Sequence, residues 1–156
     1  MNSTTALLIV HGLLAVALLG AITHQTACVW LPARRPAGSF VGRFRSVPAP
    51  SYANAVVVLY AITFLFGGIV YAEYRVGVRV VLEQLGLWWQ NGAFELKEHF
   101  AAVGLAILPA YWNCWREPAE GEHARTRAML TALLAFIVWW NFLVGHILNN
   151  VRGFGS

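Results

Sequence analysis

The sequence predicts an all-α integral membrane protein, a bundle of four transmembrane helices, and three observations support this. Apolar residues make up 58% of the 156 residues and charged residues only 12%, about half the charge that soluble domains carry. The charged residues collect in short patches that separate long apolar runs. Each of four such runs has the roughly 20 residues that a helix needs to cross the hydrocarbon core of a bilayer. The length leaves room for a single domain, residues 1–156.

The four helices are bounded by proline and by aromatic residues. Pro32 follows the first apolar run and Pro118 follows the third, and proline does not continue a helix. Tryptophan and tyrosine lie near several of the ends, as they do at membrane–water interfaces. The expected helices cover approximately residues 5–30, 52–74, 94–115 and 128–151.

The basic residues between the helices predict the orientation in the membrane. The first connection carries Arg34, Arg35, Arg43 and Arg45 and no acidic residue, and the third adds further arginines. Connections with an excess of lysine and arginine stay on the cytoplasmic side. Both termini are therefore expected outside. Orientation also explains the net charge of +4, so nucleic acid is not expected as a partner.

The second connection, residues 73–93, is not a simple loop. Apolar and polar residues alternate along it at roughly helical spacing. It is expected either to extend the second helix beyond the membrane or to lie in the interface as a short amphipathic helix.

Three histidines are predicted at one depth, on three different helices. At about 1.5 Å per residue, His11 lies in the second turn of the first helix, His99 near the start of the third and His146 about one turn before the end of the fourth. Ionisable residues are rare and costly inside membranes, so three at one level favour a functional site. The alternative is that each imidazole bonds to a neighbouring helix or reaches the headgroups.

Three kinds of chemistry suit this layer. Two imidazoles from two helices can ligate the iron of a b-type haem, and His99 with His146, on adjacent helices, is the expected pair. The three histidines, with a carboxylate from Glu95 or Glu98, would also suit copper or zinc. A His–Glu pair close to the surface is typical of a proton or quinone site.

Neighbouring polar residues are candidates for supporting roles. Asn149 and Asn150 follow His146 within about one helical turn, so either is expected to hold one tautomer of its imidazole. Lys97 lies on the side where haem propionates would need a positive charge. Asn141, in the middle of the fourth helix, is expected to join helices.

Several motifs are missing from the sequence. It has no glycine-rich phosphate loop, no CxxC, no CxxCH and no Ser/His/Asp pattern. A self-contained hydrolase or an ATP-driven pump is therefore not expected, and a subunit of a redox complex is the better prediction.

The stretch from His11 to Gly20 places a histidine early in a helix, followed by small residues and a glycine. It resembles the first helix of CopD-like and related small bacterial membrane families, although the Trp-x-Gly that often follows in those families is missing here. The resemblance implies a bacterial inner-membrane protein linked to copper handling or to b-type haem.

Taken with the histidine layer, these features predict a small multi-pass subunit of an electron-transfer system in the bacterial inner (cytoplasmic) membrane. It would hold one haem b near the outer face, with other subunits of a membrane complex, and a quinone, as candidate partners. Two alternatives stay open: a cofactor-free accessory subunit of a larger complex, and a membrane protein that handles copper or zinc through histidine and glutamate.

Overall fold

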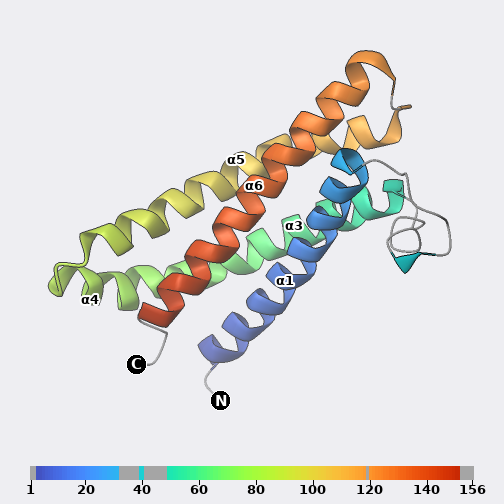
Figure 1. The fold of residues 1–156 in the computed structure, drawn as a ribbon. Coiled ribbons are helices and arrows are strands. Elements are labelled where there is room, and N and C mark those ends of the chain that lie inside the picture. The colour runs from blue at the N-terminus through green and yellow to red at the C-terminus, as the bar shows by residue number, and fades with distance from the viewer. Residues whose placement is uncertain (1–2, 32–38, 41–48, 119, 152–156) are drawn as a thin grey trace.

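The computed structural model describes residues 3–31, 39–40, 49–118 and 120–151, and within these the chain forms an all-α bundle of four long helices (Figure 1). Helix α1 packs against α3 and α6, and α5 packs against the same two helices. Ser3 and Val151 lie at one end of the bundle, called here the terminal end. The long helices are α1 (Ser3–Trp30), α3 (Ala49–Glu73), α5 (Trp88–Arg116) and α6 (Gly121–Val151).

The second connection extends the second helix, which is the first of its two predicted forms. A π-helical turn, η1 (Tyr74–Val78), and helix α4 (Arg79–Gln84) continue α3 without a break. The chain then turns at Gly86, whose φ of +69° suits a residue without a side chain. Helix α5 begins directly afterwards, several residues before the predicted position.

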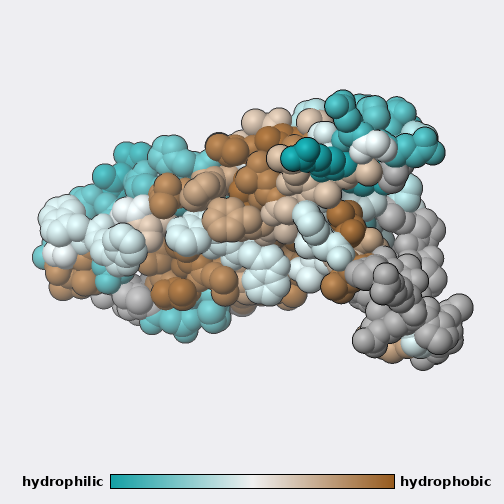
Figure 2. Space-filling model, turned by 45° about the horizontal axis from the view of Figure 1, so that its top comes forward, coloured by the Kyte–Doolittle hydropathy of each residue, from teal (hydrophilic) through white to brown (hydrophobic). Residues whose placement is uncertain are grey.

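Three of the helices are long and apolar enough to cross a membrane, as their hydropathy shows: Ser3–Trp30, Pro50–Gln84 and Gly121–Asn150. They mark the chain as a multi-pass membrane protein. Their outward side chains are apolar, for example Leu13 and Leu65 at 67% exposure each, and suit contact with lipid. Figure 2 shows apolar side chains gathered across the middle of the visible face, with hydrophilic ones towards its ends.

Helix α5 is as long as the other three but less apolar. Its first half carries Glu95, Lys97 and Glu98, so the prediction of four strongly apolar spans holds for three helices. The arginines of the first connection, which carried most of the predicted orientation, lie outside the described residues.

The half of the bundle away from the terminal end has a closed core. Ile22, Val56 and Leu134 are 0% exposed there. Side-chain hydrogen bonds join the helices around this core. Trp112 Nε1 donates to Asn54 Oδ1 at 2.7 Å, which ties α5 to α3.

A polar cluster fastens η1 and α4 to α5 at the terminal end. The Tyr74 hydroxyl donates to Asn91 Oδ1 at 2.7 Å, and the Tyr74 ring stacks on Phe94 with 3.6 Å between centroids. Arg79 bridges Glu83 and Glu95, with 2.8 Å to each carboxylate. This cluster holds the start of α5, and with it Lys97 and Glu98, against the end of the second helix.

Helices α3 and α5 come closest where a tyrosine crosses a glycine. The Tyr60 hydroxyl donates to the backbone carbonyl of Ala101 at 2.9 Å, and the ring is 4% exposed. A Cβ on Gly104 would lie 1.9 Å from the Tyr60 hydroxyl oxygen. Only glycine at position 104 therefore allows this contact.

Gly104→Ala is expected to destabilise the protein by about 1–3 kcal/mol, because the new methyl group displaces a buried ring and breaks its hydrogen bond. Adding Tyr60→Phe should recover part of the loss by removing the atom that clashes most. Gly68→Ala is the matched control, since no described atom lies within 4 Å of its Cβ position. Thermal unfolding in mild detergent measures all three, and a Gly104→Ala protein as stable as the Gly68→Ala protein would contradict this packing.

Candidate functional site

The structure separates the three predicted histidines. His11 and His146 line the same cavity, from α1 and α6. His99 is exposed on the outer face of α5, where its Nδ1 lies 2.7 Å from the backbone carbonyl oxygen of Glu95, and it lines neither cavity described below. The three histidines, which were predicted at one depth, therefore do not all point towards the same cavity.

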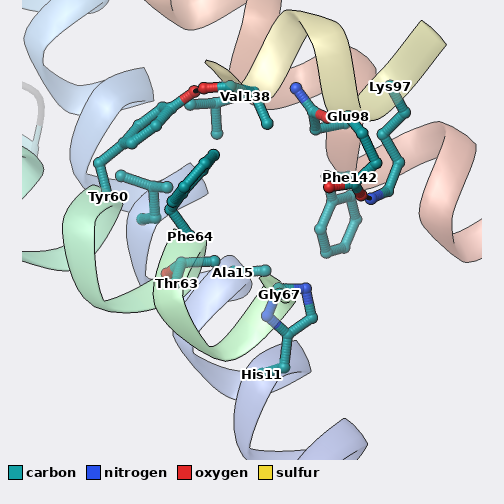
Figure 3. Close-up of a pocket in the computed structure, with 13 residues that line it drawn as sticks. His11, Ala15, Tyr60, Thr63, Phe64, Gly67, Lys97, Glu98, Val138 and Phe142 are labelled. Carbon is teal, nitrogen blue, oxygen red and sulfur yellow. Dashed lines mark hydrogen bonds and ion pairs between the residues drawn. The ribbon is translucent and has the colours of Figure 1, made fainter. Parts of the chain in front are cut away.

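Two neighbouring cavities lie between the four long helices on the terminal side of the core. The terminal cavity, about 230 Å³, is bordered by α1, the α3–η1–α4 helix, α5 and α6. The central cavity, about 90 Å³, lies deeper and is bordered by all four long helices (Figure 3). The two cavities share part of their lining: His11, Ala15, Lys97, Asn141 and Phe142.

The terminal cavity combines apolar walls with hydrogen-bonding groups. Aromatic rings of Phe94 and Phe142 line it. Polar side chains reach it from three helices: His11 from α1, Lys97 from α5, and His146 with Asn149 from α6. A ligand that is mostly apolar but carries a few hydrogen-bonding atoms matches this lining.

Lys97 and Glu98 form an ion pair at the α5 wall of the cavities. Lys97 Nζ binds Glu98 Oε1, and the two side chains are only 14% and 27% exposed. The ammonium also lies 4.5 Å from the centroid of the Phe94 ring. The stem of Lys97 passes close to Gly145 of α6, where a Cβ would lie 3.5 Å from Lys97 Cε.

His11 occupies a fitted position between α1 and α3. A Cβ on Gly67 would lie 3.2 Å from His11 Cε1, so the glycine makes room for the imidazole. Figure 3 shows the ring at the floor of the central cavity, with Tyr60 and Phe64 on one side and Lys97, Glu98 and Phe142 on the other. His11 is thus the predicted histidine that faces furthest into the bundle.

Three buried polar atoms at the central cavity lack a hydrogen-bond partner among the described residues. They are His11 Nδ1, Thr63 Oγ1 and Asn141 Oδ1, and the His11 imidazole also interacts with the backbone of Thr63. The amide nitrogen of Asn141 is engaged, because it donates to the backbone carbonyl of Ile137 at 2.7 Å. Most buried polar side-chain atoms in proteins have a partner, so three beside one cavity point to something that binds there.

The predicted supporting residues divide between the cavities and the surface. Glu98 lines the central cavity and Asn149 the terminal one. Asn150 Nδ2 lies 3.4 Å from His146 Nε2 and also donates to the His146 carbonyl oxygen at 2.8 Å. Glu95 pairs with Arg79 and lines neither cavity.

No three histidine, cysteine, aspartate or glutamate side chains lie close enough together, within the described part of the chain, to hold a metal ion. The three predicted histidines are thus not gathered as a copper or zinc site requires. Comparison with protein-family models, with characterised proteins and with solved structures finds no match to this chain.

Two polar residues of the central cavity, Thr63 and Asn141, were not predicted as site residues. Thr63 was given no role and Asn141 was expected to join helices. The signal for Lys97 and Glu98 lies in the inward face of α5, because Gly104 and Leu108 are buried at helical spacing from Ala101, which lines the central cavity. Continuing that face towards the start of the helix reaches Lys97 and Glu98 and places His99 on the opposite side.

Proposed function

We propose that this chain is a multi-pass subunit of a membrane electron-transfer system and that its terminal cavity binds the headgroup of a quinone. The observation that carries this proposal is the lining of that cavity, in which aromatic walls meet hydrogen-bonding side chains from three helices. A quinone headgroup is a flat, largely apolar ring with two carbonyl oxygens on opposite edges. It needs apolar flanks and hydrogen-bond donors on both sides.

The size of the terminal cavity suits a single ring. A cavity of about 150 Å³ accepts benzene, and the terminal cavity measures about 230 Å³. The rings of Phe94 and Phe142 provide surfaces for stacking. The apolar tail of a quinone would leave between helices whose outer faces already suit lipid.

The polar residues would hold the two oxygens of the ring. The Lys97 ammonium and an imidazole N–H of His11 are donors towards one carbonyl, and His146 with Asn149 offers donors towards the other. In the reduced form, the quinol, the ligand oxygens donate, and the imidazole and amide groups also accept hydrogen bonds. Both redox forms therefore find partners in the same side chains.

A short-chain benzoquinone is expected to bind the purified protein in lipid nanodiscs, as measured by calorimetry. Lys97→Met should weaken binding about tenfold, because a hydrogen bond from a charged donor contributes about 1.5–3 kcal/mol. His11→Ala should weaken it by a similar factor, whereas His99→Ala, on the outer face of the same layer, should leave it unchanged. Equal loss in the His11 and His99 variants would contradict the assignment to this cavity.

A second candidate function is favoured by the shared position of His11 and His146. These two histidines border one cavity from two helices, and Lys97 supplies a positive charge there, as the propionates of a b-type haem require. The pair differs from the predicted His99 and His146 because His99 faces outward. A haem has four pyrrole rings and is larger than the cavity of about 230 Å³, so α1 and α6 would have to move apart to hold it.

A reduced-minus-oxidised spectrum tests the haem candidate on protein from haem-replete cells. If haem is bound, His11→Ala and His146→Ala should each abolish the absorption bands, and His99→Ala should preserve them. Wild-type protein without such bands excludes haem at this site. A protein that binds neither haem nor quinone would leave the cofactor-free accessory subunit as its function.

We further propose that all four long helices span the bacterial inner membrane with both termini outside, as the connections and the CopD-like stretch indicate. In a background with Cys28→Ser and Cys114→Ser, Ser3→Cys should react with a membrane-impermeant maleimide in intact spheroplasts. Glu122→Cys, at the opposite end, should react only after lysis. Labelling in the reverse order would invert the orientation.

A further inference from the structure

We propose that the central cavity holds water molecules that carry protons between His11 and Glu98, an inference that rests on quinone binding in the terminal cavity. A buried water needs about 10–15 Å³ of accessible volume and two to four polar partners. The central cavity offers about 90 Å³, which is space for several waters. It is also polar where it meets His11, Thr63 and Asn141.

The buried atoms that lack partners define where the waters bind. His11 Nδ1, Thr63 Oγ1 and Asn141 Oδ1 come from three helices, α1, α3 and α6, and all belong to residues that line this cavity. Leaving these buried atoms without a partner would destabilise the protein. Water satisfies all three at once and connects them to Glu98 on the fourth helix, α5.

The Tyr60 hydroxyl does not take part in this hydrogen-bonded route. It donates to the backbone carbonyl of Ala101, so its proton is engaged and its ring forms a wall. The route from His11 to Glu98 therefore passes along Thr63 and Asn141.

His11 connects the two cavities. Its ring lines both, and Figure 3 shows one ring nitrogen on the side of Thr63 and the other on the side of Lys97 and Phe142, two residues shared by both cavities. An imidazole can accept a proton at one nitrogen and release one from the other. This position suits a group that passes protons from a ligand in the terminal cavity to water in the central cavity.

The proton transfer is balanced for the oxidation of a quinol. The quinol loses two electrons and two protons, and the electrons pass to a one-electron redox centre of a partner subunit. An O–H bond of the quinol breaks and its proton binds one nitrogen of His11. The other nitrogen releases a proton to the waters, which deliver it to the Glu98 carboxylate. Glu98 then releases it. The neutral His11 ring must turn over, so that an unprotonated nitrogen again faces the ligand, before the second proton follows the same route.

Polar or charged groups from all four long helices surround the Glu98 carboxylate. The titratable and charged groups that face it are His11 from α1, Tyr60 from α3 and Lys97 from α5. From α6 the uncharged Asn141 lines the same cavity. The Glu98 carboxylate forms an ion pair with Lys97 of the same helix.

Proton release after oxidation of bound quinol tests the route. A short-chain benzoquinol is bound to the protein in nanodiscs and oxidised by a photogenerated one-electron oxidant, and a pH dye in weakly buffered solution records the released protons. Glu98→Gln should slow release about 100-fold, the range that a positioned proton-transfer group contributes. Thr63→Val, which keeps the shape and removes the hydroxyl, should slow it about tenfold. Glu122→Gln, which removes the same charge at the opposite end, should leave the rate unchanged.

Two controls separate the route from the binding site. Quinone affinity and thermal stability of the Glu98→Gln protein should stay close to those of the wild type, so that a slower release reports proton transfer. Release at the wild-type rate in that variant overturns the role of Glu98. If the wild type binds no quinone, the proposed function fails, and the hydration is then tested directly. A structure at a resolution that shows ordered water elsewhere, with a dry central cavity, would overturn it.

Discussion

The charges near the start of α5 are the constraint on which the arrangement of the bundle depends. Lys97 and Glu98 lie about three helical turns inside a membrane-length helix, where an unpaired charge costs several kcal/mol. The bundle lowers this cost by turning both side chains inward and pairing them. Gly67 of α3 then gives space to the His11 ring. Cavities lined by polar atoms, instead of a closed core, are the consequence.

The two halves of the bundle are consequently different. On the terminal side, the helices enclose two cavities with histidine, lysine, glutamate and asparagine in their walls. On the other side, Ile22, Val56 and Leu134 are fully buried and the helices are joined by aromatic and polar contacts such as Trp112 with Asn54. The two cavities thus lie in one half of the bundle.

The helices could be predicted well from the sequence because hydropathy depends on composition along the chain. Four helices in the expected order follow from the apolar runs, and the extension through η1 and α4 was one of two predicted forms. The direction of a side chain around its helix was harder to predict. The depth of His99 follows from counting residues, but its outward direction follows from which face of α5 packs, and that face is set by Gly104 against Tyr60 and Ile137. The contact between His11 and Gly67 joins residues far apart in sequence, and no local pattern indicates it.

The position of His11 distinguishes it from the other two histidines that were predicted at its depth. His146 is exposed and stacks on Phe142 of its own helix, and His99 bonds to a backbone carbonyl of its own helix. Only His11 of the three lines both cavities, and a residue of another helix makes room for its ring. Lys97 also borders both cavities, but its ammonium has no lone pair and is held by Glu98, so it can bind and orient a ligand without relaying protons. A neutral imidazole, with one donor and one acceptor on different edges, is the group in this lining that can join a ligand on one side to water on the other.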